Sequence, residues 1–262
     1  LAAALSGVLA AGAQTGREWQ DPAVNEINRL PMRSSFAAGE RLSLDGVWKF
    51  HWVRNASERP SGIGAVDYDD AAWGSMPVPG MWELNGYGDP VYVNIGYAWR
   101  GNFRNDPPYV PDAENHVGSY RRTFDIPASW GGKDIFLSIG SATSNVYVWV
   151  NGRFVGYSED SKLEARFDLT KYVKAGENLI ALEIFRWCDG SYLEDQDFWR
   201  FSGIARGVYV YTRERERIED VNIIAGMDGN FTVNAKVTKG VRNVRVAVID
   251  RNGNQVAYRE AT

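Results

Sequence analysis

Residues 187–206 read WCDGSYLEDQDFWRFSGIAR and connect two apolar segments, 178–185 and 208–211, that the sequence predicts as strands. Loops longer than about 12 residues in a compact domain are usually functional or disordered. Disorder is disfavoured because the stretch is rich in side chains that favour burial. Those side chains are Trp187, Tyr192, Leu193, Phe198, Trp199, Phe201 and Ile204. An ordered loop that packs aromatic side chains and presents acids predicts a site for sugar hydroxyls or a hard cation.

The composition of the whole chain is that of an ordinary globular protein. Its 262 residues, 44% hydrophobic and 24% charged, suffice for one large domain or for one domain and part of another. The net charge is -4 and no basic stripe is visible, so we expect no nucleic-acid partner. The many aromatic side chains have two interpretations: they fill the core of a β-sandwich, which we favour, or they stack on sugar rings.

The single cysteine, Cys188, excludes an internal disulfide, which a core of this size does not need. We interpret Cys188 as a small buried hydrophobic residue. A nucleophilic cysteine would need a paired histidine, and neither His51 nor His116 lies in a recognisable pairing motif.

Residues 1–13 form an apolar run that ends in Ala11-Gly12-Ala13, which is typical of a signal-peptide cleavage site. We expect the remnant of a signal peptide and therefore a periplasmic or secreted protein; a frayed segment unrelated to export is the alternative. No later stretch approaches the ~18 apolar residues that span a membrane, so we expect no membrane partner. Residues 14–41 are irregular and predict an N-terminal arm, with one helical turn starting at Asp21.

Short strands with frequent turn signals, and no long helical pattern, predict an antiparallel β-sandwich over residues 42–212. The expected strands lie at residues 44–52, 119–126, 134–139, 145–150, 153–157, 167–169, 178–185 and 208–211. Asn151-Gly152 between two alternating apolar runs is a strong hairpin signal. Pro77 and Pro79 confine the segment around them to a sheet edge.

Residues 213–262 differ in texture from the sandwich. A charged segment at residues 213–217 is followed by four alternating segments with glycine-containing turns between them. The alternating segments are residues 218–225, 230–238, 241–250 and 255–260. Four such strands predict the first part of an immunoglobulin-like sandwich, which needs about seven. We therefore expect this chain to be the N-terminal part of a longer protein.

Residues 189–204 closely resemble the signature segment of the sugar-binding domain of bacterial β-galactosidases, in glycoside hydrolase family 2. Other segments fit the same family in the same order: residues 28–30, 44–50, 78–82, 90–94, 107–111 and 151–157. The resemblance covers residues 19–262. It implies a jelly-roll sugar-binding domain at residues 42–212, a partial immunoglobulin-like domain at residues 213–262, and a catalytic (β/α) barrel that is absent from this sequence. In the full-length enzyme that barrel carries the catalytic glutamates and most of the magnesium ligands.

The resemblance assigns two residues to the sugar site. Asp197 matches the family aspartate that reaches into the barrel pocket, ligates a sodium ion and contacts a galactosyl hydroxyl. Asn94 matches the loop asparagine beside the sugar. A carboxylate is a hard oxygen ligand and accepts hydroxyl protons, whereas an amide donates and accepts at once. Without the resemblance, we would favour a helix-capping or turn-capping role for Asp197.

The rest of the loop is expected to support these two residues. Glu194, Asp195 and Arg200 are expected to fix its shape through hydrogen bonds and ion pairs. Trp187, Trp199 and Phe201 are expected to pack beneath it.

We predict no catalytic residue in this chain. Retaining glycosidases place two carboxyls ~5–5.5 Å apart. Asp195 and Asp197, if extended, lie on one face at ~6.6 Å, nearer the inverting range, but a loop does not fix that spacing. Neither acid has a sequence neighbour that would raise its pKa.

Three functions remain open at this point. The chain is the non-catalytic part of an enzyme that hydrolyses terminal β-D-galactosides with retention, a stand-alone carbohydrate-binding module, or an assembly module in a homo-oligomer. Family 2 also contains β-glucuronidases and β-mannosidases. Residues 95–103 are longer and more aromatic than we expect for the family, which leaves the preference beyond the first sugar open.

Overall fold

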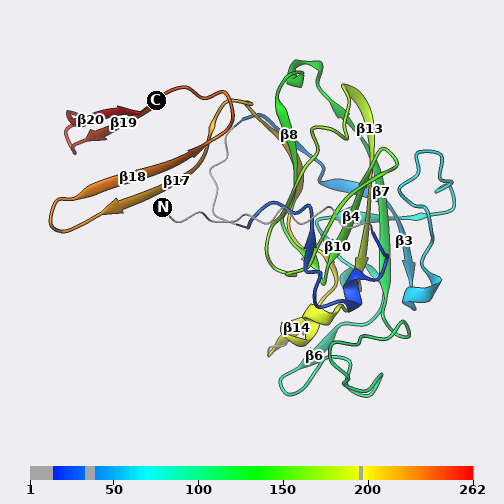
Figure 1. The fold of residues 1–262 in the computed structure, drawn as a ribbon. Helices are drawn as coiled ribbons and strands as arrows, with labels where there is room; N and C mark the ends of the chain where they lie inside the picture. Colours follow the sequence, from blue (N-terminus) through cyan, green and yellow to red (C-terminus); the bar gives the residue numbers. More distant parts are fainter. Residues whose placement is uncertain (1–13, 33–38, 195–196, 262) are drawn as a thin grey trace. The chain divides into compact units, whose positions relative to one another are not determined.

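Residues 14–32, 39–194 and 197–261 are described by a computed structural model, and they form the predicted all-β fold (Figure 1). Within these ranges the helical segments are short 3-10 turns: η1 (Glu18–Gln20), η2 (Ala56–Glu58), η3 (Glu83–Asn85), η4 (Ala128–Trp130) and η5 (Asp189–Tyr192). None of the helices described is long and apolar enough to cross a membrane. The signal-peptide prediction at residues 1–13 lies outside the described residues.

A seven-stranded antiparallel sheet forms the larger layer of the sandwich. Its strands, in spatial order, are β1 (Glu26–Ile27), β11 (Arg153–Ser158), β10 (Val146–Val150), β13 (Gly176–Phe185), β7 (Val117–Ile126), β3 (Gly46–Val53) and β4 (Gly74–Val78). Pro77 lies in the edge strand β4, as predicted, where its missing N–H leaves no gap in the ladder. Asn151 and Gly152 join β10 to β11 with φ of 50° and 82°, the positive angles of a two-residue hairpin turn.

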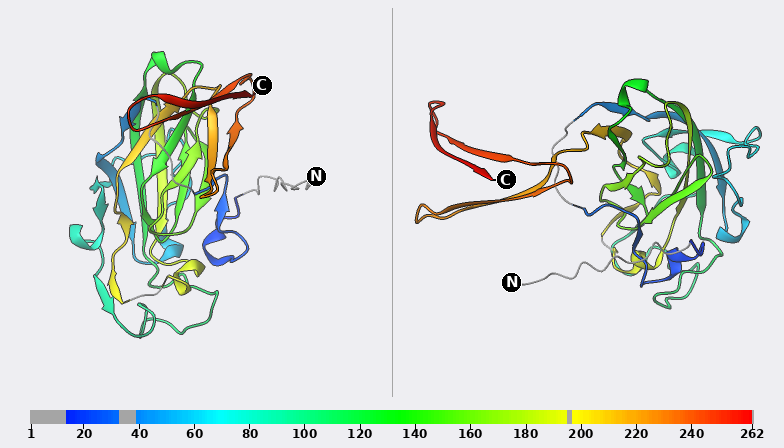
Figure 2. Two further views of the ribbon diagram at one scale, coloured as in Figure 1. Left: turned by 90° about the vertical axis from the view of Figure 1, so that its left-hand side faces the viewer. Right: turned by 45° about the horizontal axis from the view of Figure 1, so that its top comes forward.

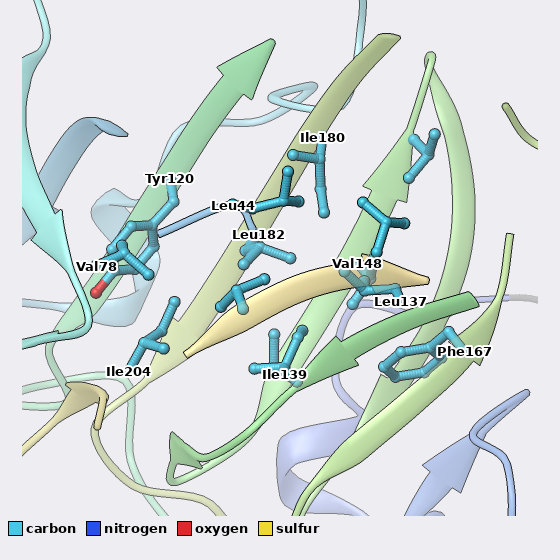
Figure 3. Close-up of a cluster of buried hydrophobic side chains, with 14 of the residues drawn as sticks. Leu44, Val78, Tyr120, Leu137, Ile139, Val148, Phe167, Ile180, Leu182 and Ile204 are labelled. Carbon is cyan, nitrogen blue, oxygen red and sulfur yellow. The ribbon is translucent and has the colours of Figure 1, made fainter. Parts of the chain in front are cut away.

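A four-stranded sheet packs against the first one and closes the main core. Its strands are β12 (Ala165–Asp168), β8 (Asp134–Ile139), β16 (Val208–Arg213) and β2 (Arg41–Ser43). Leu137 and Phe167 from this sheet meet Val148 and Ile180 from the seven-stranded sheet, and all four are 0% exposed (Figure 3). Because side chains alternate along a strand, one face of each sheet supplies this core.

The outer face of the seven-stranded sheet carries a second, aromatic cluster. Phe185 of β13 stacks on Trp19 of the N-terminal arm with ring centroids 4.9 Å apart, and Trp19 is 1% exposed. The helical turn predicted to start at Asp21 is wrong, because η1 ends before that residue and the Asp21 N–H donates to the carbonyl of Glu18. The helical turn η1 lies earlier in the chain than predicted, where Trp19 is buried. After η1, the arm joins the sheet through β1.

Residues 132–134 and 213–262 form a separate compact unit. It contains two hairpins, β17 (Ile218–Ala225) with β18 (Phe231–Val237), and β19 (Val244–Ile249) with β20 (Gln255–Ala261). The predicted turns are present, with Gly229 and Gly253 at φ of 85° and 87°. Ile223 and Phe231 are 60% and 48% exposed, and the immunoglobulin-like assignment stays a prediction.

Candidate functional site

Two short strands bring the predicted site residues together. In the part of the chain that the structure describes, β6 (Val91–Val93) and β14 (Phe198–Arg200) pair only with each other, and we call this two-stranded sheet the ribbon. It lies at one end of the sandwich in both views that show it from the side (Figure 1; Figure 2, left). Phe198 pairs with Val93, so Asn94 and Asp197 are each one residue beyond the same end of the ladder. Both are exposed, although about a hundred residues separate them in the sequence.

The carboxylate of Asp197 is oriented by a neighbour across the ribbon. Tyr92 Oη donates a hydrogen bond to Asp197 Oδ1 at 2.6 Å. This bond, and then the negative charge of the carboxylate, raise the pKa of the Tyr92 hydroxyl, so the phenol stays a donor at neutral pH. Asp197 Oδ2 has no hydrogen bond within the part of the chain that the structure describes. One oxygen is thus fixed and the other can accept a hydroxyl proton or ligate a cation.

The outward face of the ribbon is aromatic. Tyr92 and Trp199 are 51% and 53% exposed, with ring centroids 5.5 Å apart, and Phe201 stacks on Trp199 at 5.9 Å. The expectation that Trp199 packs beneath the loop is therefore wrong. The alternation of β14 directs Trp199 away from the side occupied by Phe198, so it faces solvent. Leu193, which also favours burial, is 90% exposed.

Arg200 and Glu194, two of the residues expected to fix the shape of the loop, both make side-chain contacts. The Arg200 guanidinium lies 3.9 Å from the centre of the Phe198 ring, and Arg200 Nη1 donates to the Phe198 carbonyl at 2.9 Å. Glu194, expected to fix the loop, accepts hydrogen bonds from the backbone N–H of Ser161 at 3.0 Å and from its hydroxyl. Asp195, assigned the same role, lies outside the described residues.

Beneath the ribbon the loop rests on buried aromatic side chains. Trp187 is 7% exposed and its ring centroid lies 5.4 Å from that of Trp99. Tyr192 packs edge-on against Trp99 at 4.7 Å and donates its hydroxyl proton to the Tyr109 carbonyl at 2.7 Å. Cys188 is 0% exposed, as predicted, and burial raises the pKa of its thiol well above the usual value. A neutral, enclosed thiol is not a nucleophile.

Two carboxyls approach each other in this floor, but they are enclosed. Glu159 and Asp189 are 5% and 6% exposed. Burial raises the pKa of Glu159 to about 8, and Tyr157 Oη donates to it at 2.6 Å. A side chain at Gly190 would place its Cβ 2.7 Å from Glu159 Oε2, so the backbone passes directly over this acid. The pair has no access to a sugar and does not suit glycoside hydrolysis.

A hard cation such as sodium needs more oxygen ligands than Asp197 alone offers. Among the described residues, no group of three or more His, Cys, Asp or Glu could bind a metal ion. Asp197 offers one unengaged carboxylate oxygen, whereas hard cations prefer several oxygen ligands.

A groove of about 570 Å³ lies away from the ribbon, over β10 and β13. Its lining includes Trp149 and an ion pair in which Arg59 Nε lies 3.4 Å from Glu183 Oε1. Burial raises the pKa of Glu183 to about 7. No ribbon residue lines this groove, so it is separate from the candidate site.

Sequence reasoning missed the residues that connect the ribbon to the sandwich. Tyr92 lies in a segment that carried the resemblance, yet no role was assigned to its hydroxyl. Arg186 and Glu83 contact backbone groups of Asp89 and Ser202, at the end of the ribbon opposite Asn94 and Asp197. A lone charged residue at the end of an apolar strand gives no signal of such contacts, because the partners are carbonyl and amide groups far along the chain.

Comparison with known proteins identifies the family. A family model described as "Glycosyl hydrolases family 2, sugar binding domain" matches residues 42–214, more than half of the chain. The β-galactosidase of Priestia megaterium is 44% identical over 189 residues, which cover 72% of this chain and 18% of that protein. The β-galactosidase of Lactobacillus delbrueckii subsp. bulgaricus is 36% identical over 256 residues, which cover 90% of this chain and 25% of that protein. This chain therefore spans a quarter or less of the length of these relatives.

Solved structures share the fold. A β-glycosidase from Bacteroides vulgatus matches with a TM-score of 0.58 and 23% identity over 85% of this chain and 28% of that chain. A β-glucuronidase from Ruminococcus gnavus in complex with D-glucuronic acid matches with a TM-score of 0.60 and 21% identity over 88% of this chain and 40% of that chain. At these identities the likeness concerns the fold alone. The family model and the β-galactosidase relatives show that this chain belongs to glycosyl hydrolase family 2 and carries that family's sugar-binding domain.

Proposed function

We propose that this chain is the non-catalytic, sugar-recognising part of a β-galactosidase, and that its ribbon completes a galactoside pocket in a catalytic barrel outside this sequence. The proposal is supported by the β-galactosidase relatives and by the position of Asn94 and Asp197 at one exposed end of the ribbon. The single observation that carries it is the hydrogen bond from Tyr92, which fixes one oxygen of Asp197 and leaves the other available.

The chemistry of the two residues suits a neutral sugar. Asp197 accepts a hydrogen bond from a galactosyl hydroxyl, and the amide of Asn94 donates a hydrogen bond to one hydroxyl and accepts one from another. An exposed carboxylate beside the sugar would repel the carboxylate of a glucuronide, which favours galactosides over that alternative. A sodium ion bound by Asp197 would supply a positive charge for hydroxyl oxygens. The magnesium ligands and the retaining pair of carboxylates belong, in this proposal, to the barrel.

The test is Asp197→Asn in the complete enzyme. The amide keeps an oxygen that accepts from Tyr92 but removes the charge. We expect KM for a β-galactoside to rise about 10–100-fold, which corresponds to the loss of one hydrogen bond to a charged group. We also expect activity to stop responding to sodium.

The matched control is Glu177→Gln, because Glu177 is an exposed acid at the other end of β13. It should leave KM and the sodium response unchanged. Unchanged KM and sodium response in Asp197→Asn would contradict the proposal.

The exposed pair of Tyr92 and Trp199 favours a second candidate, a carbohydrate-binding module that acts without a barrel. Calorimetric titration of this chain with galactose separates the two. Our proposal expects no measurable heat at millimolar sugar, because half of the pocket is missing. Saturable binding that Trp199→Ala abolishes would favour the module instead.

A further inference from the structure

Several side chains contact the chain at the base of the ribbon, which we define as the end where Val91 pairs with Arg200. Among the described residues, the backbone hydrogen bonds of the ribbon join β6 and β14 to each other and to no other strand. At the base, residues 89–90 lead into β6 and residues 201–202 lead out of β14.

At the other end of the ribbon, Asn94 lies five residues before the buried Trp99 and Asp197 lies five residues after the buried Tyr192. The base is thus one of the two ends at which the ribbon is anchored, and its position contributes to that of Asn94 and Asp197.

Arg186 contacts the base on the β6 side. It directly follows β13 and is 6% exposed. Its Nη2 donates to the Asp89 carbonyl at 2.9 Å, and its Nη1 lies 3.0 Å from Nδ1 of His116. Arginine has no acceptor, so the His116 Nδ1 must accept, which requires a neutral ring with its proton on Nε2. Burial, followed by the charge of Arg186, lowers the pKa of His116 to about 4, in agreement with a neutral ring.

Glu83 contacts the base on the β14 side. Its Oε2 accepts from the backbone N–H of Ser202 at 2.9 Å, and the neighbouring Trp82 N–H donates to the Ser202 carbonyl, also at 2.9 Å. Burial raises the pKa of Glu83, the Ser202 hydrogen bond opposes that effect, and the charge of Arg186 opposes it further. The charge of Glu83 in turn raises the pKa of Arg186 against the effect of burial. The two charges therefore interact across the base of the ribbon.

Arg186 also lies behind the inward face of the ribbon. A small cavity of about 30 Å³ is lined by Arg186 together with Phe198 and Arg200 of β14. Arg186 thus borders a cavity that it shares with β14, while it donates to Asp89, two residues before β6.

The burial of Arg186 and Glu83 lowers the stability of the fold. Arg186 Nε and Glu83 Oε1 are buried without a hydrogen-bond partner in the described structure. Buried charged groups that are incompletely paired destabilise a fold relative to apolar side chains of similar size. Departures of this kind are expected where a functional site needs them. The sandwich has a large apolar core and does not need a buried arginine at this position.

We propose that Arg186 and Glu83 are positioning residues for the sugar site, and that they act by fixing the two connections at the base of the ribbon, Arg186 at Asp89 and Glu83 at Ser202. This inference rests on the proposed function of Asp197. It assigns to two residues that touch no sugar the task of aligning the residues that do.

The test is a double-mutant cycle in the complete enzyme with Arg186→Met and Asp197→Asn. We expect Arg186→Met alone to raise KM for the β-galactoside about 10-fold, and to raise the sodium concentration for half-maximal activity. In the Asp197→Asn background, Arg186→Met should raise KM less than about 3-fold, because the carboxylate that Arg186 helps to position is already absent. Arg186→Lys, which cannot reach both partners, should recover only part of the loss.

Two further variants separate alignment from stability. Glu83→Gln keeps an acceptor for Ser202 but removes the charge, so it should raise KM with little change in Tm; it also carries the test if Arg186→Met does not fold. Arg59→Met removes another partly buried arginine, which donates to the carbonyls of Ala56 and Gly16 and lies away from the ribbon. Arg59→Met should lower Tm and leave KM unchanged.

The outcomes distinguish this inference from the proposed function. If Asp197→Asn has no effect, the proposed function fails and the cycle shows it directly. If Asp197→Asn raises KM but Arg186→Met and Glu83→Gln do not, or if their effects add fully to that of Asp197→Asn, the positioning role is overturned while the sugar contact stands.

Discussion

Acid should weaken this domain through His116, and His116→Asn should remove that weakness. His116 is 6% exposed, its ring packs edge-on against Trp52 at 4.8 Å, and its Nδ1 accepts from Arg186. Protonation would place a second positive charge beside the guanidinium and remove the acceptor. An asparagine oxygen can accept from Arg186 in the same place without titrating.

The magnitude follows from the pKa. Burial lowers the pKa of His116 from 6.5 to about 4, a fall of about 2.5. At about 1.36 kcal/mol per pKa unit this corresponds to roughly 3.4 kcal/mol, which we reduce to about 2 kcal/mol for solvent screening. Because the folded pKa is the lower one, the unfolded chain binds the proton first as the pH falls. The stabilisation is therefore complete above pH 6.5 and is lost between pH 6.5 and pH 4.

The measurement is urea unfolding of the 262-residue chain, followed by tryptophan fluorescence at several pH values from 7.5 to about 4.5. At about pH 7.5 the free energy of unfolding of His116→Asn should be lower than that of the wild type, because the smaller side chain leaves a void. As the pH is lowered, it should fall less steeply than that of the wild type. Glu183→Gln is the matched control of opposite sign. Burial raises the pKa of Glu183 to about 7, so its contribution to the free energy of unfolding is present in acid and is lost as the pH rises toward 7. Glu183→Gln should therefore make the free energy of unfolding fall more steeply as the pH is lowered. Parallel curves for wild type and His116→Asn would refute the reasoning.

Two further predictions concern the fold. Gly118→Ala would place a Cβ 2.4 Å from Trp82 Cζ2, so we expect a loss of about 1–3 kcal/mol of stability and a lower Tm in calorimetry; an unchanged Tm would mean that the ring can move aside. Leu137→Ala removes a side chain that is 0% exposed between the two sheets, and should cost about 2–5 kcal/mol in urea unfolding, with a cost under about 1 kcal/mol contradicting the central position assigned to it.

Most strands of the sandwich were predictable because each obeys a local rule. β8 was predicted with its observed bounds, since the alternation and flanking glycine define it. Asn151-Gly152 determined a hairpin because a two-residue turn with positive φ fixes the register of both strands. Pro77 placed β4 at an edge because a proline has no N–H to donate.

The ribbon was not predictable in the same way. β6 and β14 are three residues each, too short to show a period, and each lies inside a stretch that the sequence presented as a long loop. Their pairing joins segments about a hundred residues apart, so no turn motif announces it. The resemblance selected Asn94 and Asp197, whereas the exposure of Trp199 came as a correction that only the register of β14 explains.

The isolation of the ribbon has a consequence for divergence within the family. Among the described residues its ladder takes no backbone partner from the sandwich, so substitutions at its exposed positions, such as Tyr92 and Trp199, need not disturb the core beneath. If the ribbon recognises the sugar as proposed, substitutions at these exposed positions can change which glycosides are accepted while Arg186 and Glu83 are retained. The proposed sugar recognition and the stability of the sandwich can therefore evolve independently within one chain.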